Sequence, residues 1–407
     1  METVTITRLG HQGDGIADGP LYAPMTLPGE VVTGTVRGAQ LDDIRIVTPS
    51  SHRVAPPCRH FKSCGGCRLQ HGADEFVARW KQDVVRNALL AQGLEADFLP
   101  IATSPAFSRR RATFAVRRTS KGAIAGFHAR ASGVIVDIPD CRLLHSELLA
   151  ARPVCEALAM AGASRKQALD VAVTLSSAGL DVAVEGGKPL DGALRVALAG
   201  LANAYELARL SWAREIIVTR HPPTQHFGAT QVLPPPAAFL QATEAGQAAL
   251  LADVATITRG ARKIVDLFAG CGTFTLPLAQ DAEVHAVEGS AGMIAALDAG
   301  WRMSRGLKRV TSEARDLFRR PLLPDELFGF GAAVIDPPRA GAEAQASALA
   351  RAALPVIAYV SCNPVTFARD ARQLCDRGYR IGPVRVVDQF RWSSHVELVA
   401  GFMLDSG

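Results

Sequence analysis

The chain is poor in aromatic residues and cysteines, and it has no long apolar segment. Aromatic residues make up 6% of its 407 residues, and cysteines number eight. No stretch approaches the roughly eighteen uncharged apolar residues that a membrane-spanning helix needs, so we expect no membrane partner. The opening METVTITRLG lacks the basic flank and apolar run of a secretory signal. We therefore expect a cytoplasmic protein, in which clustered cysteines favour metal binding over disulfides.

Length and composition predict a globular protein with more than one domain. Apolar residues make up 48% of the chain and charged residues 20%, which is enough hydrophobic material for sizeable cores. A chain of 407 residues also exceeds the usual size of a single core. The proline-containing segments SSHRVAPPC and HPPTQHFGATQVLPPPAAF are typical of linkers. We expect three domains, at residues 1–54, 55–230 and 231–407, in a monomer.

The pattern of strands and helices differs between the two ends of the chain. Residues 1–54 contain short strand-like runs broken by glycine and proline, which predict a small β-barrel. From Glu244 onward, the apolar runs KIVDLF, EVHAVE, AAVIDPP and PVIAYVSC alternate with helical patterns. That alternation predicts a parallel, doubly wound α/β sheet. The last two strands, in YRIGPVRVVDQF and HVELVAGFML, are expected to form an antiparallel edge.

Charge is distributed unevenly along the chain. Residues 1–54 carry a net charge of −2, whereas residues 55–130 carry a net charge of +8. The basic residues of FSRRRATFAVRR are Arg109, Arg110, Arg111, Arg117 and Arg118. A localised basic patch is what a nucleic-acid-binding surface requires, but a strand with one solvated basic face has the same local sequence.

Three cysteines are crowded into CRHFKSCGGC, at Cys58, Cys64 and Cys67. Structural zinc sites usually pair their ligands twice, whereas this spacing contains one Cys-x2-Cys pair and outlying cysteines. The spacing therefore favours a 4Fe-4S cluster over a zinc knuckle. Isolated cysteines elsewhere, such as Cys155, are interpreted as packing residues.

A glycine-containing turn follows the first strand of the C-terminal region. VDLFAGCGTF places Gly270 and Gly272 between a strand and a helix, where backbone N–H groups can approach a ligand. Glu288 ends the next strand, where an acid can bind the two hydroxyls of a ribose. A dinucleotide fingerprint requires a third glycine where the chain has Thr275. Together with Asp266 in the opening strand, the pattern favours S-adenosylmethionine over NAD.

Three further segments bring reactive side chains to strand ends. VIDPPRAG contains Asp336 and has Arg339 where amino-group methyltransferases place an aromatic residue, which argues against nitrogen methylation. YVSCNPVTF puts Cys362 at the end of the next strand, before a proline-flanked turn where a thiolate can act as a nucleophile. SSHVELV places Glu397 at the start of the last strand.

A thiol, a carboxylate and a methyl donor together suit one reaction. C5 of uracil is a poor nucleophile until a thiolate adds at C6 and gives the ring enolate character. After C5 has taken the methyl group, a carboxylate must remove the C5 proton so that the thiol can leave. Cys362, Glu397 and the glycine-containing turn are the candidates for these three parts.

These motifs resemble the bacterial RNA uracil-5-methyltransferases, in particular the iron–sulfur branch that acts on large-subunit (23S) ribosomal RNA. The resemblance rests on Cys-x5-Cys-x2-Cys, FLQAT, SCNP and the later His-x-Glu, and it runs nearly end to end. It implies an N-terminal TRAM module of OB-type fold, a mixed α+β iron–sulfur domain and a Rossmann-like class I methyltransferase domain. It also implies RNA, expected to be 23S rRNA, as the partner.

The resemblance also implies roles for individual residues. Cys362 is the expected nucleophile, and Glu397 is the expected base. The expected ligands of the 4Fe-4S cluster are Cys58, Cys64, Cys67 and, within IPDCRLLH, Cys141. The expected contacts to S-adenosylmethionine or the target base are Gln241, Phe268, Thr273, Glu288, Asp316 and Asp336. The chain departs from the family pattern at Thr243, where Asn is expected, and in its acidic barrel, which makes residues 55–130 the better candidate for RNA binding.

Other interpretations use parts of the same pattern. A non-catalytic iron–sulfur RNA-binding protein would use the barrel and the basic patch but would leave Cys362 and Glu397 without a role. A cytosine-5 DNA enzyme would share the thiolate chemistry, but its nucleophile follows a proline, whereas Ser361 precedes Cys362 here. A uridine-5-methyltransferase that acts on tRNA is a third alternative.

Overall fold

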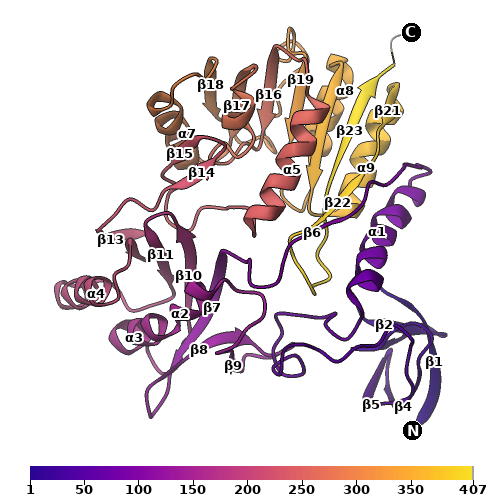
Figure 1. The fold of residues 1–407 in the computed structure, drawn as a ribbon, viewed down its shortest axis with the longest axis vertical. Helices are drawn as coiled ribbons and strands as arrows, with labels where there is room; N and C mark the ends of the chain where they lie inside the picture. Colours follow the sequence, from indigo (N-terminus) through magenta and orange to yellow (C-terminus); the bar gives the residue numbers. More distant parts are fainter. Residues whose placement is uncertain (406–407) are drawn as a thin grey trace.

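The computed structural model of the protein describes residues 1–405, which form an N-terminal barrel, a central sheet and a larger C-terminal sheet (Figure 1). The C-terminal sheet occupies the upper half of the view, the central sheet lies below it to the left, and the barrel lies below it to the right. Among the described residues, no helix is long and apolar enough to cross a membrane.

The barrel is closed by five strands in the order β1-β2-β3-β5-β4. The strands are β1 (Glu2–Leu9), β2 (Gly15–Ala17), β3 (Leu21–Ala23), β4 (Val31–Arg37) and β5 (Gln40–Thr48). Ile6, Val32 and Leu41 are among the side chains that fill its interior, because alternate residues of each strand face inward. The small β-barrel predicted for residues 1–54 is confirmed.

The central sheet has seven strands in the order β13-β12-β11-β10-β7-β8-β9. The strands are β7 (Arg111–Arg118), β8 (Ala123–His128), β9 (Ile135–Asp137), β10 (Leu169–Ser176), β11 (Gly179–Glu185), β12 (Arg209–Trp212) and β13 (Glu215–Thr219). The helices of this unit are α2 (Ser146–Ala150), α3 (Arg152–Gly162) and α4 (Gly192–Ala204). Helices α3 and α4 pack on the sheet and bury Phe114, Leu158 and Trp212, and the same core cluster includes Cys64 and Cys141.

The C-terminal sheet is doubly wound around a switch point. A hairpin, β14 (Gln225–Phe227) and β15 (Thr230–Val232), precedes it. Its parallel strands are β16 (Lys263–Leu267), β17 (Glu283–Glu288), β18 (Val310–Ala314), β19 (Ala332–Ile335) and β20 (Val356–Ser361). Its helices are α5 (Glu244–Ile257), α6 (Thr275–Leu278), α7 (Ala291–Met303), α8 (Glu343–Ala352) and α9 (Pro364–Cys375). Strand β16 lies between β17 and β19, and sheets of this kind bind ligands where such a switch occurs, outside the carboxyl ends of the strands.

The last three strands complete the sheet in antiparallel fashion. They are β21 (Tyr379–Ile381), β22 (Arg385–Asp388) and β23 (Glu397–Leu404). Strand β23 lies between β20 and β22 and runs antiparallel to both, and β21 pairs with its far end. The predicted antiparallel pairing of the closing strands is therefore confirmed, but they do not form the edge, because the short β6 (Ala102–Thr103) adds beyond β22.

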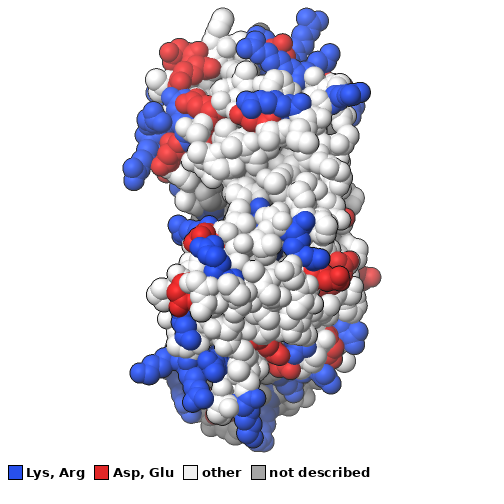
Figure 2. Space-filling model, turned by 90° about the vertical axis from the view of Figure 1, so that its left-hand side faces the viewer, with Lys and Arg blue, Asp and Glu red and all other residues white. Residues whose placement is uncertain are grey.

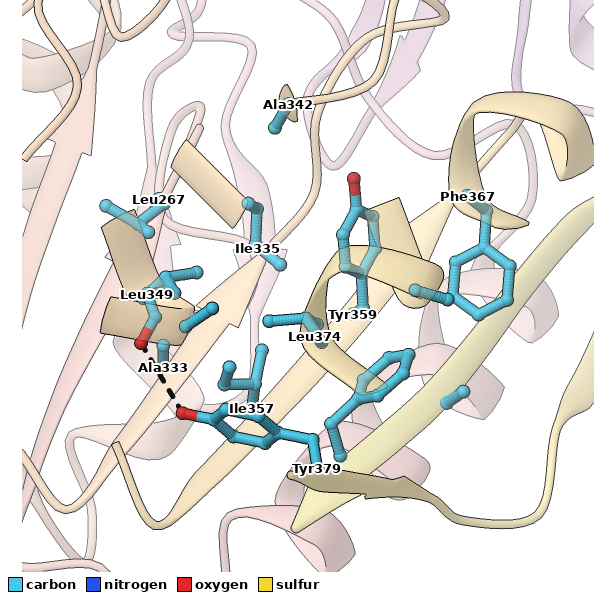
Figure 3. Packing of buried hydrophobic residues seen from close by; sticks show 14 of the residues in the cluster. Leu267, Ala333, Ile335, Ala342, Leu349, Ile357, Tyr359, Phe367, Leu374 and Tyr379 are labelled. Carbon is cyan, nitrogen blue, oxygen red and sulfur yellow. Dashed lines mark hydrogen bonds between the residues drawn. The ribbon is translucent and has the colours of Figure 1, made fainter. Parts of the chain in front are cut away.

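A large apolar cluster holds helices α8 and α9 against the C-terminal sheet (Figure 3). Ile357 and Tyr359 of β20 lie on the same side as Phe367 and Leu374 of α9. The Tyr379 hydroxyl donates a hydrogen bond to the carbonyl oxygen of Leu349 in α8, at 3.4 Å. The apolar runs of these strands are continuous rather than alternating because helices cover the sheet on both faces.

Residues 74–103 lie in the first third of the sequence but pack on the C-terminal sheet. Helix α1 (Asp74–Leu90) contacts α9, and Val85 and Leu89 belong to the C-terminal core. Fully buried Lys81 donates to Asp388 Oδ1 at 2.6 Å and to the carbonyl of Phe390 at 3.1 Å. The expected domain bounds stay a prediction, and this helix belongs with the C-terminal core.

We expect the protein to lose much of its stability when only one partner of the Lys81–Asp388 pair is replaced. Lys81→Met leaves a buried carboxylate without its cation, which should destabilise the protein by about 3 kcal/mol or more. Lys81→Met combined with Asp388→Leu removes both charges and should recover much of that loss. Thermal unfolding midpoints of the two variants and the wild type test this. A single variant as stable as the double variant would contradict it.

Candidate active site

Residues 268–274, between β16 and α6, form a tight loop at the switch point. Phe268, Gly270 and Gly272 have positive φ angles of 62°, 58° and 94°. At Gly272 a Cβ atom would lie 3.0 Å from leucine side chains of α6 and α7, so a larger residue would displace them. Thr273 is half-buried within this loop. The loop therefore brings backbone N–H groups to the position predicted for a cofactor.

Glu288 closes this loop from the end of β17. Its Oε2 accepts the N–H of Gly270 at 3.1 Å, and its Oε1 accepts the N–H of Ser290 at 2.9 Å. Each carboxylate oxygen keeps a lone pair for another donor, such as a ribose hydroxyl. The structure therefore places Glu288 where the sequence predicts it.

An aromatic pair and an acid flank the loop on another side. The rings of Phe268 and Phe318 lie 5.5 Å apart, and Phe318 is half-exposed. Asp316 is exposed and accepts the N–H of Phe318 at 3.0 Å. An apolar face beside a carboxylate suits an adenine ring with an amino group. Phe318 is absent from the sequence-based prediction because an exposed Phe carries no pattern of its own.

Two acids lie at the carboxyl ends of β16 and β19, and Asp266 is fully buried whereas Asp336 is half-buried. Burial raises the pKa of Asp266 to about 7, although it accepts a hydrogen bond of 2.5 Å from Thr275. Burial and the charge of Asp266 raise the pKa of Asp336 to about 7. Oδ1 of Asp266 is buried without a hydrogen-bond partner among the described residues. A buried carboxylate oxygen in this state fits a cationic ligand, such as one with sulfonium and ammonium groups.

Cys362 and Glu397 lie beside each other although 35 residues separate them. Ser361 of β20 pairs with Leu398 of β23, so the residue after one strand faces the residue that begins the other. Burial raises the pKa of Cys362 to about 11, and the charges of Glu397 and Asp336 add to the rise. Burial, followed by the charge of Asp336, raises the pKa of Glu397 well above its usual value. The thiol and the two carboxyls thus form one electrostatic cluster.

Two buried glutamines connect the carboxyls of this cluster. Gln389 Nε2 donates to Gln241 Oε1 at 2.6 Å and to Glu397 Oε2 at 3.1 Å. Gln241 Nε2 in turn lies 3.4 Å from Asp336 Oδ2. The predicted residues Gln241, Asp336 and Glu397 are therefore joined by a single hydrogen-bonded chain.

Four cysteines come together between the barrel and the central sheet. Burial, together with the charges of Cys141, Cys64 and Cys58, raises the pKa of Cys67 to about 12. Backbone N–H groups point at two of the sulfurs: Gly66 N lies 3.4 Å from Cys64 Sγ, and Leu143 N lies 3.5 Å from Cys141 Sγ. Cys155, by contrast, lies in the core of the central sheet with no exposed surface.

The donor set of this cysteine site is compatible with an iron–sulfur cluster. Thiols that repel one another's charge, with N–H groups aimed at their sulfurs, suit a centre that binds thiolates. Among residues 1–405, no three side chains are grouped closely enough to hold one metal ion. Each cysteine of a four-iron cluster binds a different iron, whereas a zinc ion takes all of its ligands on one metal, and the choice between the two stays a prediction.

A cleft of about 1160 Å³ is lined by Cys362 and by Gly65 and Gly66, which lie between Cys64 and Cys67 in the sequence. The barrel contributes Arg8, and the cysteine segment contributes Arg68. The central region contributes Arg109, and the C-terminal sheet contributes Arg339 beside the thiol. A cleft lined by cations from all three parts suits a polyanion larger than a mononucleotide. The face in Figure 2, in contrast, shows basic and acidic side chains around a largely uncharged middle rather than one continuous basic surface.

The chain's relatives are RNA methyltransferases. A family model described as tRNA (Uracil-5-)-methyltransferase matches residues 235–406. An uncharacterized RNA methyltransferase of Mesorhizobium japonicum is 46% identical, over 97% of this chain and 96% of its own length. The 23S rRNA (uracil(1939)-C(5))-methyltransferase of Halomonas elongata is 37% identical, over 97% of this chain and 88% of its own length. The chain belongs to the RNA uracil-5-methyltransferase family.

A solved structure shares the fold of this methyltransferase. It is the Pyrococcus abyssi tRNA (uracil-54, C5)-methyltransferase in complex with S-adenosyl-L-homocysteine. The TM-score is 0.78 with 23% sequence identity, and the match covers 98% of this chain and 99% of that one. The predicted class I methyltransferase fold is confirmed at this level.

The basic segment of the methyltransferase differs from the sequence-based prediction. Arg110 is 5% exposed and donates to the carbonyl of Gln241 at 3.2 Å, and Arg111 donates to the carbonyl of Leu240 at 2.9 Å. These two arginines therefore connect the central sheet to the C-terminal region by hydrogen bonds and do not lie free on a surface. Arg109 lines the cleft. The local sequence does not reveal which arginine of RRR will be buried.

Sequence reasoning also missed a polar pair beside Cys362 of the methyltransferase. Arg339 Nη2 lies 2.9 Å from His395 Nδ1, and both residues line the cleft with Cys362. Burial and the charge of Arg339 lower the pKa of His395, which favours the neutral imidazole. Arg339 also opposes the rise in the pKa of Cys362.

We expect the Cys362 thiol to react slowly with alkylating reagents in the protein without substrate. Because the thiol has a pKa of about 11, its alkylation by iodoacetamide should rise about tenfold per pH unit between pH 7 and 10. Glu397→Gln removes a negative neighbour and should shift this curve to lower pH. Peptide mass spectrometry measures both curves, with buried Cys155 as the unreactive control. Full reactivity of Cys362 at pH 7 would contradict the geometry.

Proposed function

We propose that the protein transfers a methyl group from S-adenosylmethionine to C5 of a uridine in RNA, through a covalent bond between Cys362 and C6. The observation that carries the proposal is the antiparallel register that sets Glu397 beside Cys362, which lines the cleft. Asp336, whose charge acts on both groups, donates its N–H to the carbonyl of Leu267, directly before the loop at residues 268–274, at 3.2 Å. Thiol, carboxyl and loop are the parts that C5 methylation requires. A non-catalytic RNA-binding protein would gain nothing from setting the buried carboxyl of Glu397 and the half-buried carboxyl of Asp336 beside a thiol.

The Cys362 thiol gives its proton to solvent water, and the thiolate adds to C6, which moves the C5–C6 electron pair toward C4 and makes C5 nucleophilic. Bound S-adenosylmethionine supplies an electrophilic methyl group on its sulfonium. The Glu397 carboxylate takes the proton from methylated C5, the C5–C6 double bond forms again, and the thiolate leaves. The charge of Arg339 favours the thiolate at the first and last steps.

The cofactor would lie against the loop at residues 268–274. Glu288 would receive the ribose hydroxyls, and Phe268 with Asp316 would flank the adenine. Asp336 and the unpaired oxygen of Asp266 offer negative charge to the methionine end. Gln241 lies between Asp336 and Gln389, where it can contact the cofactor or the uracil. Thr273 lies in the same loop, and no separate contact with the cofactor is assigned to it.

We propose that the RNA substrate is 23S rRNA. We also propose that the protein is a cytoplasmic monomer. The Halomonas elongata relative named for 23S rRNA aligns with 97% of this chain. A tRNA substrate is the alternative, because the Pyrococcus abyssi enzyme of the same fold is named for tRNA. Methylation of deproteinised 23S rRNA and of total tRNA, with labelled methyl donor, separates the two.

We also assign a 4Fe-4S cluster to Cys58, Cys64, Cys67 and Cys141, within a TRAM-containing architecture. The mutual charge repulsion of the thiols and the N–H groups aimed at Cys64 and Cys141 support it. A bound cluster would supply covalent cross-links between the cysteine segment and the central sheet, and no step of methyl transfer is assigned to it.

The cluster assignment predicts the colour and iron content of the protein. Anaerobically purified protein should be brown, with broad absorbance near ~400 nm and about four irons per chain. Replacing any of the four ligands by Ser should bleach the protein, whereas Cys155→Ser should not. Colourless protein with stoichiometric zinc would rule out the cluster.

The catalytic assignment predicts two different failures. Cys362→Ala should bind RNA and cofactor but form no adduct and transfer no methyl group. Glu397→Gln should transfer the methyl group but stall at elimination, because loss of an acid–base group slows a step by about a hundred- to ten-thousand-fold. Denaturing gels with labelled methyl should therefore show a protein–RNA adduct in Glu397→Gln. Normal turnover by Glu397→Gln would mean that the base lies elsewhere.

The cleft predicts which arginines contribute to RNA affinity. Arg8→Gln and Arg68→Gln should each flatten the salt dependence of RNA binding by about one unit for each phosphate that the arginine neutralises. Arg351→Gln, an exposed change on α8, serves as the control. Binding isotherms at several salt concentrations measure the slopes. Equal slopes in all of these variants would show that the cleft does not hold the phosphates.

A further inference from the structure

Gln389 is oriented by its surroundings. Its Oε1 accepts the backbone N–H of Ala242 at 2.7 Å. A backbone N–H can only donate, so the oxygen must point that way and the amide hydrogens must point at Gln241 and Glu397. Among the described residues, Glu397 Oε2 takes one of these hydrogens, and Oε1 accepts no hydrogen bond.

Close packing and hydrogen bonds fix the position of Gln389. Gly246 lies under it in the first turn of α5, where a Cβ atom would approach the Gln389 Cβ to 2.7 Å. The preceding residue, Asp388, is held by Lys81, and its carbonyl accepts the N–H of Ser104 at 3.0 Å. Gln389 itself is 3% exposed, so water does not compete for its hydrogen bonds.

We propose, resting on the function proposed above, that Gln389 is a positioning residue that keeps Glu397 charged and leaves its Oε1 directed at the C5 proton. A donor aimed at one carboxylate oxygen favours the ionised form and fixes the plane of the carboxyl. The same amide fixes Gln241, so one side chain aligns the base and the glutamine that lies beside Asp336. Gln389 therefore acts through Glu397 and touches no reacting atom.

The charges around Glu397 make such a donor necessary. The titratable groups on the surrounding elements are Asp336 and Arg339 after β19, Cys362 after β20, the Asp388–Lys81 pair on β22 and α1, and His395 before β23. Burial and Asp336 push Glu397 toward its protonated form, and the Gln389 hydrogen bond acts against them, together with Arg339. A protonated Glu397 cannot take the C5 proton.

Elimination follows methyl transfer, so loss of Gln389 should affect the end of the reaction. In Gln389→Leu, decay of the covalent protein–RNA adduct should slow by about 10- to 100-fold at pH 7, the effect of losing a hydrogen bond to a charged group. The slow decay should recover as pH rises, because Glu397 regains its charge at a higher pH. The kcat should fall while kcat/KM for RNA stays close to that of the wild type.

The test is a single-turnover reaction with labelled methyl, sampled on denaturing gels between pH 6.5 and 9. Gln389→Glu keeps the volume and adds a second carboxyl, so its decay curve should shift further toward high pH. Gln345→Leu is the matched control, because Gln345 is equally buried but bonds only the backbone of Leu322.

The outcomes separate the inference from the proposed function. A Gln389→Leu decay curve with the wild-type pH dependence, or the same shift in Gln345→Leu, would overturn the positioning role. If Glu397→Gln still accumulates adduct in that case, the proposed function stands. Absence of any adduct in both Gln389→Leu and Glu397→Gln would overturn the two together.

Discussion

Strand β23 runs antiparallel to β20 with Ser361 opposite Leu398, and this register decides what the site can do. The register sets Glu397, the first residue of β23, beside Cys362, the residue that follows β20. A slip by one residue would turn Glu397 to the other face of the sheet and separate it from Cys362. Leu398, Ala400 and Phe402 hold the register, because all of them are buried in the C-terminal core. The chemistry therefore depends on core packing well away from the cleft.

The loop between β22 and β23 extends this dependence to the cysteine site. Gln389 begins the loop beside Glu397, and His395, near the end of the loop, lines the cleft. Between them, the carbonyl of Trp392 accepts the N–H groups of Arg68 and Leu69 at 2.8 and 3.0 Å. The Trp392 ring packs with Cys67 in a small buried cluster. One short loop thus contacts Glu397, the cleft and the segment that carries three of the four clustered cysteines.

Much of the fold was predictable because its signals are local. The apolar runs predict β16, β17, β19 and β20, and two glycines mark the loop at the switch point because their positive φ angles favour glycine. Strand β18 has little apolar signal, since Val310 is its one fully buried residue. The pairing of β6 with β22 joins residues nearly 300 positions apart, and no local pattern encodes it.

The candidate site was predictable in part for the same reason. Cys362 and Glu397 stand at strand ends within short motifs, so the sequence could single them out. The role proposed for Gln389 depends on the distant neighbours Gln241 and Ala242 and on Glu397, eight residues along the chain, and a lone glutamine gives no sign of them. The burial of Arg110 likewise follows from how the central sheet docks on the region after β15.

The central claim is methylation at C5 of uridine, and release of the C5 hydrogen tests it most directly. RNA transcribed with uridine carrying tritium at C5 would be incubated with the protein and S-adenosylmethionine labelled in its methyl group. C5 methylation expels the C5 hydrogen, so one tritium should enter water for each methyl group that enters RNA. Methyl transfer without tritium release would mean that another atom is methylated and would contradict the account.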